Sequence, residues 1–169
     1  MRKYLVLSLA VLLVFGLGSV ALAADNDSQD VVVTVGDINE VSLATGSTTI
    51  TIASTDATAG TATVSKSSSA LTDELKWTTN GTSKKITVAL TTTAPTKYTL
   101  KVTGSNITSG AGTLATMPVS LSATATDFIT SITTSAGDCD IQYTVDYNVS
   151  AGPVTEETNT VTYTIVAGT

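Results

Sequence analysis

The sequence predicts an all-β protein whose strands form an antiparallel β-sandwich, immunoglobulin-like with additional strands. Apolar and polar residues alternate over short runs, and turn signals separate these runs at about 8–12 residues. No stretch shows helical periodicity of useful length. About a quarter of residues 24–169 is Thr, which is β-branched and favours strands. A closed barrel is the alternative, and the lack of a repeat with a fixed period argues against a solenoid.

The first 23 residues have the pattern of a secretory signal peptide. Arg2 and Lys3 supply a positive start, residues 4–20 are almost wholly apolar, and residues 21–23 read Ala-Leu-Ala, a cleavage signal. An uncleaved anchor is the alternative, because an apolar run of ~20 residues can span a bilayer. We therefore expect a secreted or cell-surface protein without stable membrane insertion after cleavage. Residues 24–169 are expected to form a single domain.

The predicted mature chain is strongly acidic. It holds 6 Lys and no Arg against 14 acidic residues, which gives a net charge of −8. Proteins that bind nucleic acid or anionic membranes need basic patches, so neither is an expected partner. The lysines all lie between residues 66 and 101, and acids alone flank them. This asymmetry fits either a solvated surface or complementary faces on neighbouring subunits.

The N-terminal half contains five short runs with apolar side chains on one face. They cover residues 31–35, 41–43, 50–52, 62–64 and 75–79. Gly36 and Asp37 mark a turn after the first run. Asn80 and Gly81 form the strongest short hairpin signal, because both residue types accept positive φ. The next strand, residues 86–90, is therefore expected to pair with the strand that contains Trp77.

The C-terminal half continues the same pattern. Expected strands cover residues 98–102, 117–123, 141–149 and 161–165, whereas residues 128–132 fit either a strand or one helical turn. Residues 104–116 form the longest expected loop, and Gly137 and Asp138 are expected to turn. The last two strands are predicted to pair with each other. Their link, residues 150–159, is about twice as long as a common hairpin loop, so a longer excursion between them is the alternative.

Strand parity predicts which side chains are buried. Trp77 shares a face with Leu75 and is expected in the core, with stacking on a sugar as the alternative. Cys139 is the single cysteine and shares parity with Ile141, so it is predicted to be buried as a small hydrophobe. An intermolecular disulfide or a free thiol is the alternative for a lone cysteine in a secreted chain. The tyrosines expected on the same apolar face are Tyr143, Tyr147 and Tyr163.

The chain contains no His. This removes the usual general base at neutral pH, the Ser–His and Cys–His nucleophile pairs, and the main protein ligand of zinc and copper. We therefore expect no enzyme, no cofactor and no metal site. A calcium loop is the alternative, because Ca²⁺ takes carboxylate and carbonyl oxygens. Its candidates are Asp138 with Asp140, and Asp25, Asp27 and Asp30, for which solvated acids are the preferred interpretation.

Four Asn-x-Ser/Thr sequences are candidate glycosylation sites. They begin at Asn26, Asn80, Asn106 and Asn148. Asn80 and Asn106 fall in expected loops, where a glycan has room, and Asn148 falls on the polar face of its strand.

Two stretches carry a resemblance to known proteins. Residues 75–102 include Leu-Lys-Trp-Thr-Thr-Asn, Lys-Ile-Thr-Val and Tyr-Thr-Leu-Lys-Val, and residues 160–165 read Thr-Val-Thr-Tyr-Thr-Ile. Here the chain resembles secreted prokaryotic β-sandwich proteins, which include subunits of fimbrial and surface-fibre type. The resemblance implies the same fold and a structural role outside the cell. The paired cysteines of many fimbrial and spore-coat proteins are absent, so no functional residue is transferred.

These observations favour a structural subunit of an extracellular filament, pilus-like fibre or surface layer that associates with itself. Strand exchange is the expected mechanism, in which an extended segment of one subunit fills an open sheet edge of the next. The candidate donor is Val31, Val32, Val33, Thr34 and Val35. The alternative is a secreted monomeric binding or adhesion module that recognises glycan or protein through residues 104–116 and 150–159.

Overall fold

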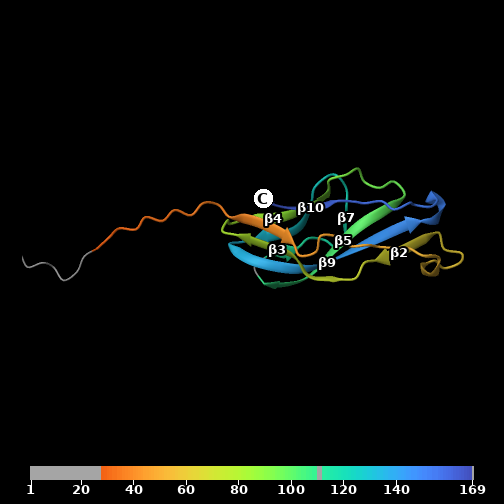
Figure 1. The fold of residues 1–169 in the computed structure, drawn as a ribbon, viewed down its shortest axis with the longest axis horizontal. Coiled ribbons are helices and arrows are strands. Elements are labelled where there is room, and N and C mark those ends of the chain that lie inside the picture. Colours follow the sequence, from red (N-terminus) through yellow and green to blue (C-terminus); the bar gives the residue numbers. More distant parts are fainter. Residues whose placement is uncertain (1–27, 110–111, 169) are drawn as a thin grey trace, which may run out of the picture. The chain divides into compact units, whose positions relative to one another are not determined.

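The computed structural model describes residues 28–109 and 112–168 (Figure 1). The chain divides into two units between Val35 and Gly36, and all the strands belong to the second. The regular structure is almost entirely β, with two antiparallel sheets, which confirms the predicted all-β sandwich class. The predicted signal peptide, residues 1–23, lies outside the described residues.

The first sheet, called sheet A, contains six strands. In order across the sheet they are β1 (Asn39–Leu43), β3 (Leu71–Thr79), β9 (Ser135–Asn148), β5 (Tyr98–Ser109) and β7 (Val119–Ser120), and β2 (Thr63–Ser67) also pairs with β9. Sheet B contains β10 (Val161–Ala167), β4 (Lys84–Leu90), β8 (Thr126–Ile132) and β6 (Thr113–Leu114), in that order. Two short 3₁₀ turns complete the fold, η1 (Ser54–Asp56) and η2 (Val149–Ala151).

Strands β2 and β3 lie end to end along the same side of β9. Thr63 pairs with Asn148 at one end of this line, and Thr79 pairs with Ser135 at the other. Ser68 bridges the interruption, because its backbone N–H donates to Tyr143 O at 2.8 Å and its Oγ accepts from Tyr143 N at 3.2 Å. The central strand β9 is therefore flanked along its whole length.

Two predicted strand pairs turn out to be corners between the sheets. β3 lies in sheet A and β4 in sheet B, so Asn80 and Gly81 do not close a hairpin; the residue with positive φ in this turn is Ser83, at 56°. β9 and β10 also lie in different sheets, so the predicted pair 141–165 is wrong. Both sheets turn an apolar face to one core, and alternation within a strand does not distinguish a neighbour in the sheet from a neighbour across it.

The structure differs from the sequence prediction at three further places. Residues 104–116 are mostly strand, since β5 continues to Ser109 and β6 follows, with a bulge at Asn106 where φ is 49°. Gly137 and Asp138 lie within β9 instead of forming a turn. Residues 50–52 form no strand, although Ile50 packs against the core. Residues 128–132, which the sequence left open, belong to strand β8.

The parity predictions for the core are largely confirmed. Trp77, Cys139, Tyr143 and Tyr163 are buried, whereas Tyr147 is half-buried and donates its OH to Gly152 O at 2.7 Å. Burial raises the pKa of Cys139 to about 12, so the thiol is protonated at neutral pH. The free, fully buried Cys139 is not placed for an intermolecular disulfide in the folded protein.

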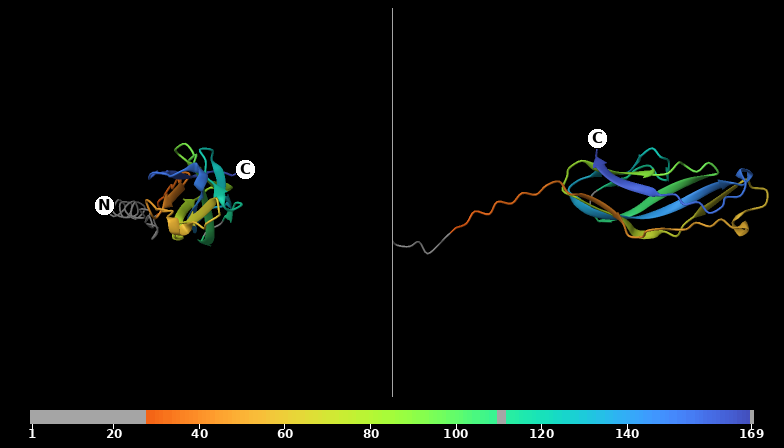
Figure 2. Two further views of the ribbon diagram at one scale, coloured as in Figure 1. Left: turned by 90° about the vertical axis from the view of Figure 1, so that its right-hand side faces the viewer. Right: turned by 45° about the horizontal axis from the view of Figure 1, so that its top comes forward.

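The strands run along the long direction of residues 36–169, so this unit has two distinct ends (Figures 1 and 2). At one, the Asn80 end, the Asn80 side-chain amide donates to Gly36 O at 2.8 Å, and Gly168 N donates to Ser83 O at 2.6 Å. At the other, the loop end, residues 91–97 face residues 149–160. The described residues include no helix with the length and hydropathy to cross a bilayer.

Candidate functional site

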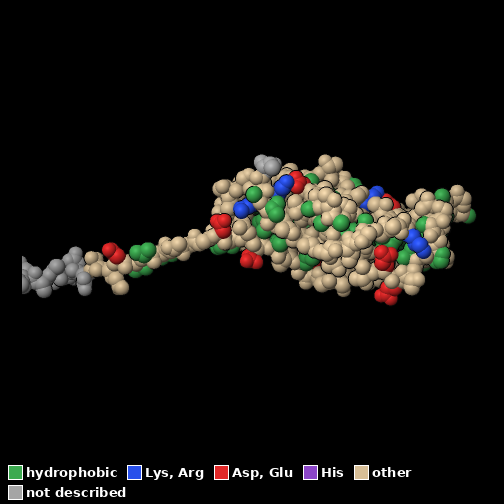
Figure 3. Space-filling model, turned by 90° about the horizontal axis from the view of Figure 1, so that it is seen from above, with side chains coloured by type: hydrophobic (Ala, Val, Ile, Leu, Met, Phe, Trp, Pro, Cys, Tyr) green, Lys and Arg blue, Asp and Glu red, His purple; other side chains and the backbone are tan. Residues whose placement is uncertain are grey.

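The candidate donor, called here the valine segment, is residues 31–35. It is assigned to no helix or strand. Val31, Val32, Val33 and Val35 are 78%, 90%, 76% and 68% exposed, and hydrophobic side chains stand out along this extended stretch (Figure 3). A run of exposed valines is unusual in a chain whose other surfaces are rich in Thr, and contiguous exposed apolar surface marks an interaction site.

One long side of the sandwich, called the closed side, is shut by the chain itself. Residues 115–118 lead from β6 in sheet B to β7 in sheet A. Leu121 N donates to Leu100 O in β5 at 2.9 Å, and Leu90 N in β4 donates to Ser122 O at 2.8 Å. Two consecutive residues therefore bond to opposite sheets. Val119 and Leu121 are buried beneath this crossing.

The opposite long side, called the open seam, lies between β1 and β10. These two edge strands lie next to each other, but among the described residues no ladder of backbone hydrogen bonds joins them. Their core-facing side chains are incompletely covered. Leu43 is 40% exposed, although its partner in register, Leu75, is fully buried. The other apolar side chains along the seam, all half-buried, are Val41, Val161 and Ile165.

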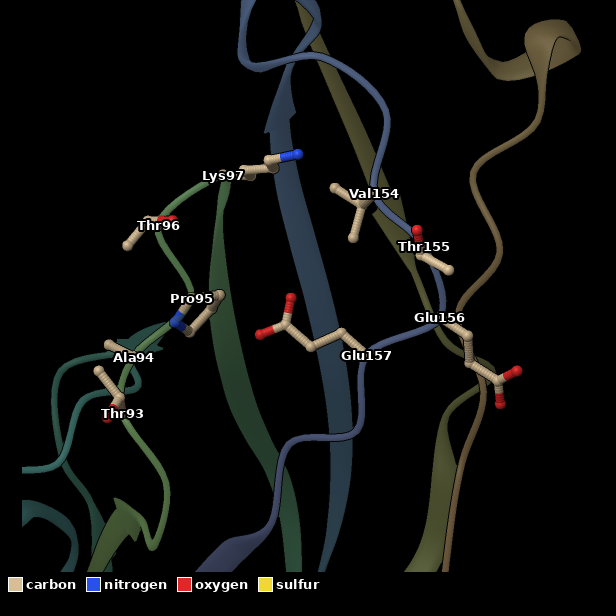
Figure 4. A pocket seen from close by; sticks show the side chains of 9 residues that line it. All are labelled: Thr93, Ala94, Pro95, Thr96, Lys97, Val154, Thr155, Glu156 and Glu157. Carbon is tan, nitrogen blue, oxygen red and sulfur yellow. The ribbon is translucent and has the colours of Figure 1, made fainter.

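A shallow groove of about 410 Å³, called the loop groove, lies at the loop end. It is lined by Thr93, Ala94, Pro95, Thr96, Lys97, Val154, Thr155, Glu156 and Glu157. Figure 4 shows the Glu157 carboxylate directed into the space beside Pro95, the Glu156 carboxylate directed away, and the Lys97 amine reaching towards Val154. This groove offers hydroxyl, carboxylate and ammonium groups beside small apolar surfaces.

Side-chain hydrogen bonds hold the longer of the two loops in place. Lys97 Nζ donates to Pro153 O at 2.8 Å, and Asn159 Nδ2 donates to Tyr98 OH at 2.5 Å. Burial raises the pKa of Tyr98, the Asn159 bond lowers it in part, and the Glu157 carboxylate raises it further. These contacts order residues 149–160. The groove therefore presents hydrogen-bond donors and acceptors that could bind a ligand.

Two buried acidic residues, Glu74 and Asp140, accept hydrogen bonds that support the fold. Glu74 is buried, and its Oε1 accepts from Thr45 N at 2.7 Å, which secures the chain as it leaves β1. Asp140 accepts from Asn106 Nδ2 at 2.8 Å and so supports the bulge in β5. Asp30 is exposed. In the described part of the chain, no three His, Cys, Asp or Glu side chains are gathered as metal ligands.

The sequons differ in what their side chains already bind. Asn80 donates to Gly36 O, and Asn106 donates to Asp140, so a glycan at either nitrogen would compete with an internal hydrogen bond. Asn148 is exposed, and its Oδ1 accepts from Ser150 N at 3.0 Å. Asn26 lies outside the described residues. Among the described sequons, Asn148 is therefore the one whose side-chain hydrogen bonds use the oxygen and leave the amide nitrogen to a glycan.

No family model, curated protein or solved structure matches the chain. The function must therefore be argued from the site itself. The sequence pointed to the valine segment and to residues 150–159. It did not indicate the open seam or the part of residues 91–97 that completes the loop groove, because both arise where segments distant in sequence meet.

Proposed function

We propose that the protein is a structural subunit of an extracellular filament, pilus-like fibre or surface layer, secreted through its N-terminal signal. Subunits join when the valine segment of one is added as a strand to another. The exposure of Val31, Val33 and Val35 on a secondary-structure-free stretch is the observation that supports this proposal. Main-chain hydrogen bonds supply affinity in such strand addition, and alternate side chains supply register. This role requires no catalytic group.

The free energy available from the valines is substantial. Full burial of a Val side chain contributes about 1.5–3 kcal/mol. Three valines on one face of a strand therefore contribute roughly 4–9 kcal/mol before the costs of ordering the segment and of association are subtracted. A filament gains one such contact for each added subunit, so its length depends on the net affinity of that contact relative to the subunit concentration.

The proposal is tested by electron microscopy and sedimentation of the secreted protein. Deletion of residues 24–35 should abolish polymers and leave a folded monomer with unchanged far-UV circular dichroism. Deletion of residues 24–30 is the matched control, because it removes the acidic leader and keeps the valines. Filaments that persist without residues 24–35 would show that the segment is not the donor.

The loop groove supports a second candidate function, a secreted adhesion module for a glycan or a protein. Its hydroxyl and carboxylate groups can hydrogen-bond a hydroxyl-rich ligand, while Pro95 and Val154 offer apolar contact. Glycan-array binding that is lost in Glu157→Gln and kept in Glu156→Gln would support it, because the two carboxylates point in opposite directions (Figure 4). An array on which the native monomer binds nothing would remove this candidate.

A further inference from the structure

The sandwich has two long margins at which another strand could be added, and they differ in how far they are already occupied. On the closed side, β7 pairs with β5 at Lys101 and Val102, and residues 115–125 pass between the sheets. An added strand would have to displace this crossing. At the open seam, β1 pairs on one side with β3, β10 pairs on one side with β4, and their outer edges face each other without a ladder.

The open seam also lacks apolar cover. Leu43 faces the same way as Val41 and points to the core side of β1, yet it stays 40% exposed. On β10, Tyr163 is buried, but Val161 and Ile165 on the same face are only half-buried. A strand with small β-branched side chains on one face would complete this margin of the core.

We infer that the valine segment of one subunit occupies the open seam of a second subunit by pairing with the outer edge of β10. This inference rests on the proposed function and names the surface that receives the donor. The segment has five residues and β10 has seven, so the edge is long enough. Every strand pair in both sheets is antiparallel. An antiparallel donor with Val33 opposite Ile165 brings Val35 opposite Tyr163, with the valines facing the core.

The direction of the donor decides where Asp30 falls. Asp30 directly precedes the valine segment and is exposed. In the antiparallel arrangement it lies beyond Ala167, whose partner in register is Lys84. A parallel donor would carry Asp30 to the opposite end of β10, near Val161. The two directions therefore place Asp30 at opposite ends of β10.

A second copy is favoured over the same chain as the source of the donor. Within one chain the simplest closure is a two-residue turn at Gly36 and Asp37 that folds the valine segment back on β1. Such a turn needs the backbone groups of Ile38, but Ile38 N already donates to Asn80 Oδ1 at 2.8 Å and Ile38 O accepts from Asn80 N at 3.2 Å. Asn80 therefore already occupies the backbone groups that a fold-back on β1 would use.

Disulfide trapping tests the inference on the full-length secreted protein. Thr34 and Thr164 are both exposed and would lie opposite each other on the solvent face of the proposed pair. In a Cys139→Ala background, one protein carries Thr34→Cys and a second carries Thr164→Cys. Mild oxidation of the mixture should give a disulfide-linked heterodimer. The matched control replaces the second protein with Ser120→Cys, on the exposed face of β7 at the closed side, and should give none.

The outcomes separate this inference from the proposed function. If the protein forms filaments but Thr34→Cys cross-links to the Ser120→Cys protein and not to the Thr164→Cys protein, the donor is received at the closed side. That result would overturn the assignment of the open seam and retain strand exchange. A bond that forms only inside one chain carrying both Thr34→Cys and Thr164→Cys would show closure in the same chain and overturn the second-copy assignment. Absence of polymers in the parent protein, together with absence of any cross-link, would overturn both.

Discussion

The two long sides of this sandwich contain similar apolar residues but differ in how the chain covers them. On the closed side, Val119 and Leu121 are buried because residues 115–125 cross between the sheets and bond to both. On the open seam, Leu43 and Ile165 remain partly exposed because β1 and β10 have no covering segment within the same compact unit. The core is therefore covered on the closed side and only partly covered at the open seam. The exposed valine segment has the apolar, β-branched composition that could cover the open seam.

The largest effect is expected in the core next to the closed side. Phe128 is fully buried. Its ring packs edge-on against the ring of Tyr163, with the two ring centroids 5.3 Å apart. Phe128→Ala should lower the free energy of unfolding by about 3–5 kcal/mol, because lost burial adds to the cavity that remains. Urea titration followed by circular dichroism measures the free energy of unfolding of the variant and of the native protein. Thr126→Ala, at an exposed position of the same strand, should change it by less than about 0.5 kcal/mol.

Glycine substitutions should distinguish the two sides more finely. A Cβ on Gly104 would lie 2.7 Å from Leu114 Cδ2 and 2.9 Å from Phe128 Cζ, whereas a Cβ on Gly46, just after β1, would have no atom within 4 Å. Gly104→Ala should therefore cost about 1–3 kcal/mol of stability through overpacking. Gly46→Ala should be neutral or stabilise by up to about 1 kcal/mol. Equal thermal midpoints for the two variants would contradict the asymmetry.

A smaller loss is expected on the open seam. Leu43→Ala should lower the free energy of unfolding by about 1 kcal/mol or less, because a side chain that is 40% exposed loses little burial. Leu75→Ala is the control, since Leu75 is its partner in register and fully buried, and should cost about 2–5 kcal/mol. A loss at Leu43 as large as that at Leu75 would mean that the seam is already complete in the monomer.

The smallest effect is expected at the solvent face of sheet A, where a substitution removes no buried apolar surface. The Lys101 ammonium, and then the Ser65 hydroxyl, hold the pKa of Asp146 below its ordinary value. This contribution is present above the ordinary Asp pKa of about 4 and is lost as pH falls through the lower pKa of the folded protein. For this half-buried surface pair it amounts to about 0.5 kcal/mol. Urea midpoints of native protein and Asp146→Asn should differ slightly at pH 6 and converge near pH 2.

Much of the local structure follows from the sequence because strand geometry is local. Alternation placed Trp77 and Cys139 in the core and indicated nearly every strand, since successive side chains necessarily point to opposite faces. The valine segment was predicted as a strand donor on other grounds, because it is apolar, lies near the N-terminus and follows an acidic, polar leader. Composition supported the expectation of a non-catalytic protein, because the lack of His removes the usual general base at neutral pH, and that expectation stays a prediction.

The tertiary structure alone decided how the strands combine. Alternation made β9 and β10 look like a pair, yet they lie in opposite sheets and meet face to face through Tyr143 and Tyr163, whose OH groups are 3.1 Å apart. A strand's apolar face is satisfied equally by a neighbour beside it or by a sheet opposite it, and the choice depends on contacts between residues far apart in the chain. For the same reason the closed side, the open seam and the loop groove became visible only when distant segments were brought together.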